Sequence, residues 1–325
     1  MIRTRIAMTL LATGVVAVAT SASGQSTVRL PRIGWLATAL TPAYVEAFRD
    51  GLRERGWIDG QSCVIDWRFA DGKPERLPEV AADLVRAGVD VIVASTNRAA
   101  FAAKGATSAI PIVAVATHDA VGTGLVASLA RPGGNVTALE SLAPELDAKR
   151  LQLVSELVPR ATRIGVLYNS LDVAGPLHVR YAEAGARALN QTLRLLDVRD
   201  AQALESALAV IERERPDALL VFTDVVTFLR RAAIVEFAAR TRLPAIYEFR
   251  DFVEAGGLAA YGPSLRDMVR RAASQVDRIL RGARPADLPV EQPTRFELVL
   301  NLRTARALGL ALSPSILARA DEIIP

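Results

Sequence analysis

The chain has 325 residues, which is enough for two α/β units that each bury a core of their own. Its formal net charge is only +4, and its arginines are mixed with acidic residues along helical patterns, as in Glu212–Arg215. A nucleic-acid partner is therefore not expected. The single cysteine, Cys63, excludes an internal disulfide and a cysteine-based metal site.

The N-terminus has the layout of a secretory signal peptide. Arg3 and Arg5 precede an apolar run from Ile6 to about Ala19, and small residues around Gly24 form a candidate cleavage site. The run is shorter than the ~20 residues that span a bilayer, so a membrane anchor is the weaker alternative. We therefore expect residues 1–24 to be removed. We expect no lipid anchor, because no cysteine lies near the cleavage site.

Short apolar strands alternate with helical patterns in the first half of the chain. Strands are predicted over Arg32–Ala37, Cys63–Phe69, Val89–Ala94 and Ile112–Ala116, with helices over Pro42–Gly56, Leu77–Arg86 and Arg98–Thr107. Continuous apolar strands that alternate with helices predict a parallel sheet covered on both faces. The segment Arg131–Asn135 interrupts this pattern and suits a crossover to a second lobe.

The second half repeats the same alternation. Strands are predicted over Arg163–Tyr168, Leu193–Val198, Ala218–Phe222, Ala245–Tyr247, Leu258–Tyr261 and Phe296–Leu300, and helices over Glu145–Leu157, Leu177–Leu189, Ala201–Glu214, Phe228–Arg240 and Leu265–Leu280. Residues 282–293 are expected to be a connector, and the chain from Leu317 a tail. Three short patterns recur in the same order in both halves, which favours two lobes of like topology.

Polar side chains follow the predicted strands where each strand ends. They are Thr38, Ser95, Thr96, Asn97, Thr117, His118 and Asp119 in the first half, and Tyr168, Asn169, Thr223, Asp224 and Glu248 in the second. The apolar ring of Phe249 follows Glu248 at the same strand end. Ligands of parallel sheets bind beyond the carboxyl ends of the strands, so these residues are the candidate binding site. Ser95–Asn97 also begin a helix, which favours an anion such as a carboxylate. The alternative for each residue alone is an ordinary helix cap.

Signals for catalysis are weak. No G-x-S-x-G motif occurs, and Gly122–Ala127 fits a dinucleotide-binding pattern only at a distance from the strand end. His118 and Asp119 lack a third metal ligand. We therefore expect no catalytic residues, no cofactor and no metal.

Three stretches carry a resemblance to a known family. Residues 110–113, 119–126 and 131–137 resemble the signature of an ABC-transporter substrate-binding protein family that includes tryptophan- and tyrosine-type binding proteins. Further matches cover nearly the whole mature chain. The resemblance implies a type I periplasmic-binding-protein fold, with two lobes joined by hinge crossovers and no catalysis. The N-terminal lobe is then expected over residues 30–138 and 262–290, and the C-terminal lobe over 139–261 and 291–325.

The resemblance also implies a function. We expect a monomeric periplasmic protein that binds a small organic solute, such as an amino acid or related carboxylate, between its lobes and delivers it to ABC permease subunits. Glu248 and Phe249 stand where aromatic amino-acid binders carry smaller polar groups, so they are expected to set ligand choice, Phe249 by stacking and Glu248 by charge. The alternative is that Glu248 pairs with Arg250 or another arginine at the surface. Two other functions stay open: an enzyme on the same frame, and a periplasmic sensor for a membrane receptor.

Overall fold

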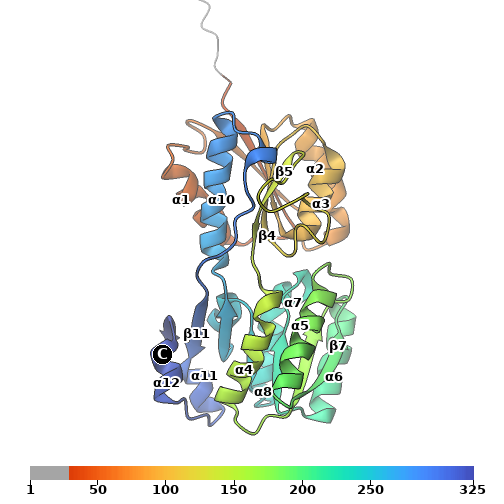
Figure 1. The fold of residues 1–325 in the computed structure, drawn as a ribbon, viewed down its shortest axis with the longest axis vertical. Coiled ribbons are helices and arrows are strands. Elements are labelled where there is room, and N and C mark those ends of the chain that lie inside the picture. The colour runs from red at the N-terminus through yellow and green to blue at the C-terminus, as the bar shows by residue number, and fades with distance from the viewer. Residues whose placement is uncertain (1–28) are drawn as a thin grey trace, which may run out of the picture.

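The computed structural model describes residues 29–325, and the expected signal peptide lies outside the described residues. Two α/β units lie end to end and are joined by segments that cross between them (Figure 1). Across residues 29–325, none of the helices combines the length and the apolar character that crossing a membrane requires.

The first unit is a five-stranded parallel sheet in the order β2-β1-β3-β4-β5. Its strands are β1 (Arg32–Ala37), β2 (Val64–Phe69), β3 (Val91–Ser95), β4 (Ile112–Thr117) and β5 (Val136–Glu140), and its helices are α1 (Pro42–Arg53), α2 (Leu77–Arg86), α3 (Thr96–Ala106) and α10 (Leu265–Leu280), besides the short 3-10 turns Pro74–Arg76 and Pro285–Asp287. Side chains alternate along the strands, so Val91 and Val93 pack under α1 and α10 while Ile92 and Ala94 pack under α2 and α3.

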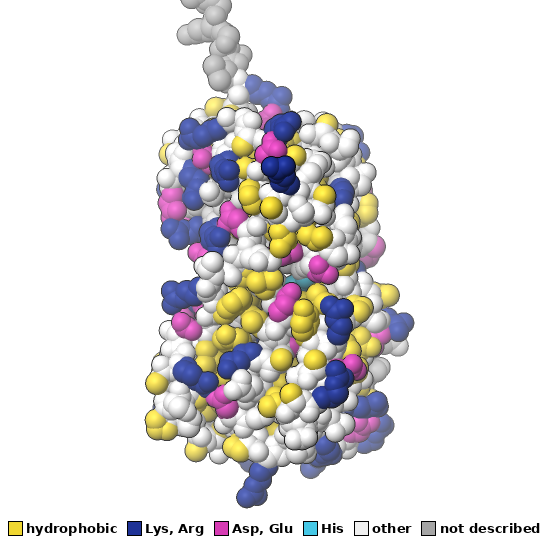
Figure 2. All heavy atoms as spheres, viewed as in Figure 1, with side chains coloured by type: hydrophobic (Ala, Val, Ile, Leu, Met, Phe, Trp, Pro, Cys, Tyr) yellow, Lys and Arg dark blue, Asp and Glu magenta, His cyan; other side chains and the backbone are white. Residues whose placement is uncertain are grey.

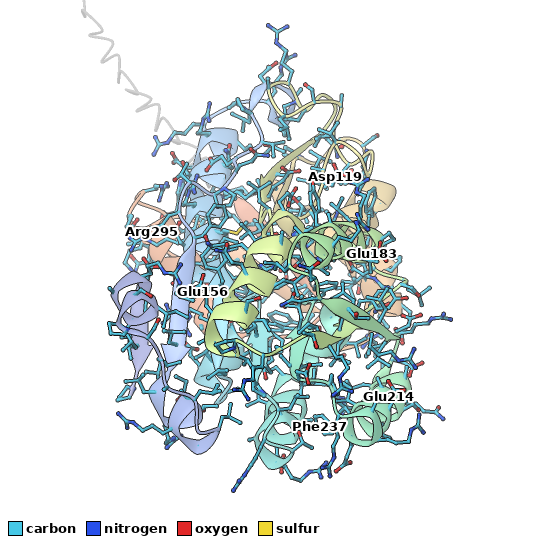
Figure 3. The ribbon with its side chains drawn as sticks, turned by 60° about the horizontal axis from the view of Figure 1, so that its bottom comes forward. Asp119, Glu156, Glu183, Glu214, Phe237 and Arg295 are labelled. Carbon is cyan, nitrogen blue, oxygen red and sulfur yellow. The ribbon has the colours of Figure 1, made fainter. Side chains whose placement is uncertain are left out.

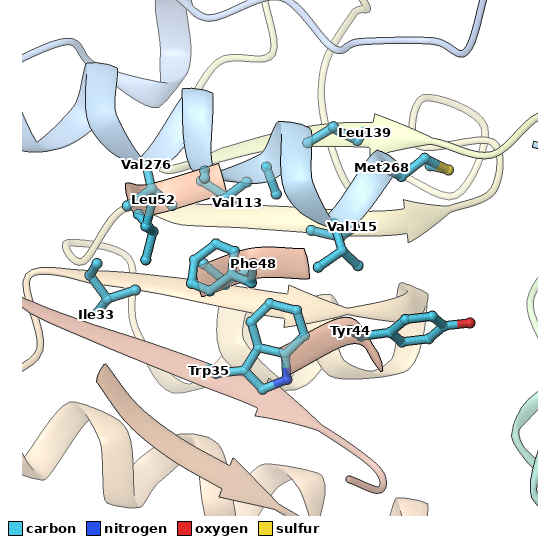
Figure 4. Packing of buried hydrophobic residues seen from close by; sticks show 14 of the residues in the cluster. Ile33, Trp35, Tyr44, Phe48, Leu52, Val113, Val115, Leu139, Met268 and Val276 are labelled. Carbon is cyan, nitrogen blue, oxygen red and sulfur yellow. The ribbon is translucent and has the colours of Figure 1, made fainter. Parts of the chain in front are cut away.

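Helices α1 and α10 pack closely over the first of these faces. Phe48 and Leu52 of α1 belong to the same core cluster as Met268 and Val276 of α10 (Figure 4). Gly51 makes this approach possible, because a Cβ atom there would lie 2.2 Å from the carbonyl oxygen of Arg270. Helix α10 thus completes the first core, although it follows strands of the other unit in the chain.

The second unit is a seven-stranded sheet in the order β12-β11-β10-β9-β8-β6-β7. Its strands are β6 (Arg163–Tyr168), β7 (Thr192–Asp197), β8 (Ala218–Val221), β9 (Ala245–Tyr247), β10 (Ala259–Gly262), β11 (Glu297–Asn301) and β12 (Glu322–Ile324). Its helices are α4 (Asp147–Leu157), α5 (Gly175–Ala188), α6 (Ala201–Glu214), α7 (Val225–Leu229), α8 (Arg231–Arg240), α9 (Arg250–Glu254), α11 (Leu302–Ala307) and α12 (Pro314–Arg319), with a 3-10 turn at Pro144–Leu146. All neighbouring strands are parallel except β10 and β11.

Three expectations about the course of the chain need correction. The crossover expected at Arg131–Asn135 comes later, because Val136–Glu140 still pairs with β4 as the edge strand β5. The helix expected over Phe228–Arg240 is two helices, α7 and α8. The expected C-terminal tail instead contains strand β12, which pairs with β11.

The chain crosses between the units three times: after β5, between β10 and α10, and before β11. The first and third crossings lie together, since the backbone N–H of Glu140 donates to the carbonyl of Glu291 at 2.8 Å. On the face shown in Figure 2, basic and acidic side chains are mixed over both units. No part of that face therefore carries a broad stripe of one sign.

Candidate functional site

A cavity lies between the two units, at the carboxyl ends of strands from both sheets. Its empty space is about 1010 Å³, including the part open to solvent. We call it the inter-unit cavity. Its walls contain five aromatic side chains, Trp35, Tyr44, Phe69, Phe228 and Phe249. Its polar lining, apart from Tyr44, consists of Thr38, Thr41, Ser95, Thr96, Asn97, His118, Asp172, Thr223 and Asp224, with no Lys or Arg among the lining residues of the described chain.

The wall from the first unit is built at the end of β1 and the start of α3. Ser95 is the N-cap of α3, but its side chain makes no capping hydrogen bond, so the first N–H groups of the helix lack that partner. The hydroxyl oxygens of Thr38 and Thr96 are buried and have no hydrogen-bond partner within the described structure. This wall therefore offers unused donors and acceptors to a ligand.

The backbone is strained at the same place. Thr96 has φ = 82° and Ala116 has φ = 55°, and both residues line the inter-unit cavity. Such left-handed conformations are costly for residues with a Cβ and persist where surrounding structure enforces them, often at ligand sites. The strain here coincides with the unpaired Thr96 hydroxyl.

The wall from the second unit carries two carboxylates. Asp224 caps α7, with Oδ1 accepting the N–H of Thr227 at 2.9 Å, and the amide of Asn169 donates to its Oδ2. Asp172 lies nearby; burial raises its pKa, and the charge of Asp224 raises it further. The hydroxyl of Thr223 is buried without a partner. This wall suits a cationic group.

The two units contact each other through residues of the cavity and its surroundings. The hydroxyl of Tyr44 in the first unit donates to Oδ2 of Asp251 in the second at 3.0 Å, and its ring stacks on Phe228 with centroids 6.3 Å apart. Figure 4 shows the Tyr44 ring reaching out of the first core, its hydroxyl away from the strands. Arg98 donates to the carbonyl of Leu171 at 3.1 Å. These contacts hold the two walls facing each other.

The structure brings eight of the residues predicted from sequence to the cavity. They are Thr38, Ser95, Thr96, Asn97, His118, Thr223, Asp224 and Phe249. Asn169 stands behind the wall and supports Asp224. Asp119 is exposed on the first unit, where its Oδ1 accepts the N–H of Gly122 in a turn (Figure 3).

Glu248 is placed elsewhere than Phe249. It is fully buried and does not line the cavity. It belongs to a set with Asp147, Arg150 and His178, which we call the buried charge cluster. Arg250, the surface partner considered above, pairs instead with Glu254, Glu297 and Glu322.

Within the buried charge cluster, Arg150 Nη1 lies 2.5 Å from Asp147 Oδ1 and 3.9 Å from Glu248 Oε1. His178 Nδ1 lies 2.6 Å from Asp147 Oδ2 and 3.4 Å from Glu248 Oε1. Burial disfavours a charged His178, but the two carboxylates outweigh this and raise its pKa. Burial also raises the pKa of Glu248.

The same cluster has the residue types of a metal site. Asp147, His178 and Glu248 each offer one ligand atom, and these three atoms lie within 4.8 Å of one another. The guanidinium of Arg150 already supplies a positive charge between the two carboxylates, however. Its Nε also donates to the carbonyl of Tyr261 at 2.8 Å and its Nη1 to that of Ala143 at 2.7 Å. A cation would have to compete with this arginine, so we interpret the cluster as structural.

Sequence reasoning missed five lining residues with direct roles in the walls: Trp35, Tyr44, Phe69, Phe228 and Asp172. Phe69 is the last residue of β2, and Asp172 lies four residues after the end of β6. A search that covered the last residue of each strand and the four residues after it would have included both. Tyr44 and Phe228 sit in helices, where their spacing resembles that of core residues. No local pattern distinguishes them.

The chain is similar to known binding proteins over most of its length. The family model described as ABC transporter substrate binding protein matches residues 39–324. The tyrosine-binding protein of Clostridioides difficile (strain R20291) is 29% identical over 265 residues, covering 82% of this chain and 76% of that protein.

Two solved structures share the fold closely. The ABC domain in complex with L-Trp from Streptococcus pneumonia has 27% identity and a TM-score of 0.85, covering 91% of this chain and all of that one. A conserved domain protein from Vibrio cholerae has 27% identity, a TM-score of 0.84 and the same coverage. The two α/β units thus form the type I periplasmic-binding-protein fold that the resemblance implied. The chain belongs to the family of ABC transporter substrate-binding proteins.

Proposed function

We propose that this protein is the periplasmic solute-binding component of an ABC importer and binds an aromatic L-amino acid in the inter-unit cavity. The two units would act as its lobes, and its partners would be the ligand and the permease subunits. The names of the tyrosine-binding relative and of the L-Trp complex support this ligand class. The proposal also includes export by the signal peptide over residues 1–24.

The observation that carries the proposal is the division of chemistry inside the cavity. Five aromatic rings offer an apolar slot for a planar side chain. Asp172 and Asp224 on one wall suit an ammonium group, and the lining residues that the structure describes include no Lys or Arg to oppose it. The start of α3 and the unpaired threonine hydroxyls on the other wall suit a carboxylate. An aromatic amino acid carries all three parts.

Calorimetry with a panel of solutes tests this ligand. L-tryptophan and L-tyrosine should bind, whereas indole-3-propionate, which lacks the amino group, and tryptamine, which lacks the carboxylate, should each bind more weakly. Thermal shift gives a second reading, because a ligand at about 100 times its Kd adds about 2.7 kcal/mol to stability. Absence of binding by every aromatic amino acid would refute the proposal.

A pair of matched variants locates the ammonium site. Asp224 and Asp200 both cap helices by accepting an N–H three residues on, at 2.9 Å and 2.8 Å, but only Asp224 lines the cavity. Asn caps a helix about as well as Asp. Asp224→Asn should therefore weaken binding about 10- to 100-fold through the lost charge, while Asp200→Asn should leave it unchanged. Equal effects would place the ammonium group elsewhere.

The importer role needs a cellular test. Uptake of the labelled amino acid should fall when the protein is deleted and return when it is restored. N-terminal sequencing of periplasmic material should show a chain that begins near Gln25. Normal uptake without the protein would point to the sensor alternative.

A further inference from the structure

We infer that His118 is a specificity-determining residue, which donates one hydrogen bond from Nε2–H to the carboxylate of the bound solute. This inference rests on the proposed function and deepens it: the first unit would recognise the carboxylate and the second unit the ammonium group. The argument starts from the groups that hold His118 in place.

Asn97 fixes the backbone of His118. The side-chain oxygen of Asn97 accepts the His118 N–H at 2.8 Å, and its Nδ2 donates to the His118 carbonyl at 2.9 Å. Asn97 is itself only 3% exposed. The loop after β4 is thereby tied to the start of α3, so His118 stands next to the unpaired groups of that wall.

Ser141, in the first crossing between the units, fixes the ring. Its Oγ lies 2.8 Å from His118 Nδ1 and accepts the N–H of Ala143 at 3.3 Å. Ser141 is fully buried, and its hydroxyl hydrogen has no acceptor besides Nδ1 among the described residues. The hydroxyl therefore donates to Nδ1, which leaves the ring proton on Nε2.

The ring is neutral as well as oriented. Burial, together with the neighbouring His178 and Arg150, lowers the pKa of His118 to about 3. Among residues 29–325, no carboxylate forms a hydrogen bond or ion pair with the ring to oppose this, whereas His178 contacts Asp147. His118 thus stays a neutral N–H donor over the physiological pH range.

The Nε2 atom is the part of the ring that remains for a ligand. It makes no hydrogen bond within the described structure, and it is not sealed from solvent as Nε2 of His178 is. His118 lines the inter-unit cavity on the same side as Ser95 and Thr96. Since the opposite wall carries the acidic groups, the acceptor that meets this N–H is the carboxylate.

Two variants and two ligands test the role. Gln at position 118 can still donate from its amide, whereas Leu cannot. We expect His118→Leu to weaken L-tryptophan binding by about 10- to 100-fold, the range for one hydrogen bond to a charged group, and His118→Gln to keep most of the affinity. Binding of tryptamine, which has no carboxylate, should be the same in the wild type and both variants.

Several results overturn the inference. Equal losses for tryptophan and tryptamine in His118→Leu would mean a general disturbance of the cavity, and a His118→Gln variant as weak as His118→Leu would mean that the donor is irrelevant. A ¹⁵N NMR spectrum that shows the proton of His118 on Nδ1 in the unliganded protein would also overturn it. Failure of the proposed function is a different result, because it appears in the wild type as absence of binding to any aromatic amino acid.

Discussion

Replacing Arg150 by Met should strongly destabilise the protein. The guanidinium donates to the carbonyls of Ala143 and Tyr261, at the ends of two crossings between the units, and to Asp147 at 2.5 Å. The side chains of Arg150, Asp147 and Glu248 are 0% exposed. The substitution removes the cation and leaves two carboxylates buried near His178.

The size of the effect follows from this burial. Removing one partner of a buried ion pair costs about 3–5 kcal/mol, because the other charge stays buried without compensation. That is a large share of the 5–15 kcal/mol that stabilises a typical protein. At about 2–4 °C per kcal/mol, the midpoint of thermal unfolding should fall by about 6–20 °C. Methionine fills most of the volume, so a cavity contributes little.

Urea unfolding at pH 6 measures this change. The two carboxylates raise the pKa of His178, so at this pH Arg150 and His178 are the two basic groups that face Asp147 and Glu248. Adding Glu248→Gln to Arg150→Met removes one of the two carboxyl groups left without the guanidinium and should recover part of the stability. Arg295→Met is the control, because the Arg295 side chain is 83% exposed and should change stability by less than about 0.5 kcal/mol. An Arg150→Met variant within about 0.5 kcal/mol of the wild type would refute the reasoning.

Three further predictions concern packing, closure and pH. Gly51→Ala should destabilise the protein by about 1–3 kcal/mol through the clash with α10, whereas Gly105→Ala, in helix α3 with open space around it, should stabilise it by about 0.4–1 kcal/mol; urea midpoints of both variants decide. Tyr44→Phe removes the hydrogen bond to Asp251 between the units and should weaken ligand binding by about 3- to 12-fold in calorimetry; unchanged affinity would mean that this contact does not help hold the units together. Because the pKa of His118 is about 3 when folded and about 6.5 when unfolded, its contribution to stability is present above pH 6.5 and is lost as the pH falls toward 3. His118→Gln should therefore show a weaker loss of stability than the wild type between pH 6.5 and pH 4, and parallel curves would count against the lowered pKa.

The sequence predicted most strands and the positions where they end, because buried parallel strands are continuous apolar runs between helical patterns. It did not predict which way Glu248 points. Strand β9 is buried on both faces, so apolar and polar residues do not alternate along it. The direction of the Glu248 side chain, which follows the strand, therefore cannot be predicted from such an alternation. Successive side chains of an extended segment point to opposite sides, which is how Phe249 reaches the cavity and Glu248 the buried charge cluster.

Other features depend on partners far along the chain. Strand β12 has three residues, too few for a periodic pattern, and it exists because β11 offers an edge. The buried charge cluster also depends on distant residues, since Arg150 donates to the carbonyl of Tyr261 across 111 positions, so no local motif predicts it. Tyr44 likewise contacts Asp251 across 207 positions, and its role depends on how the units meet.

The late position of α10 in the chain bears on how the protein is made. The ribosome completes all five strands of the first sheet and the whole segment up to β10 before it adds Leu265–Leu280. Until then the sheet face of Val91 and Val93 is covered by α1 without α10, so the first unit cannot reach its final packing early in synthesis. Such a delay keeps a growing chain unfolded for longer. That property would help a protein that must be threaded through a membrane before it folds.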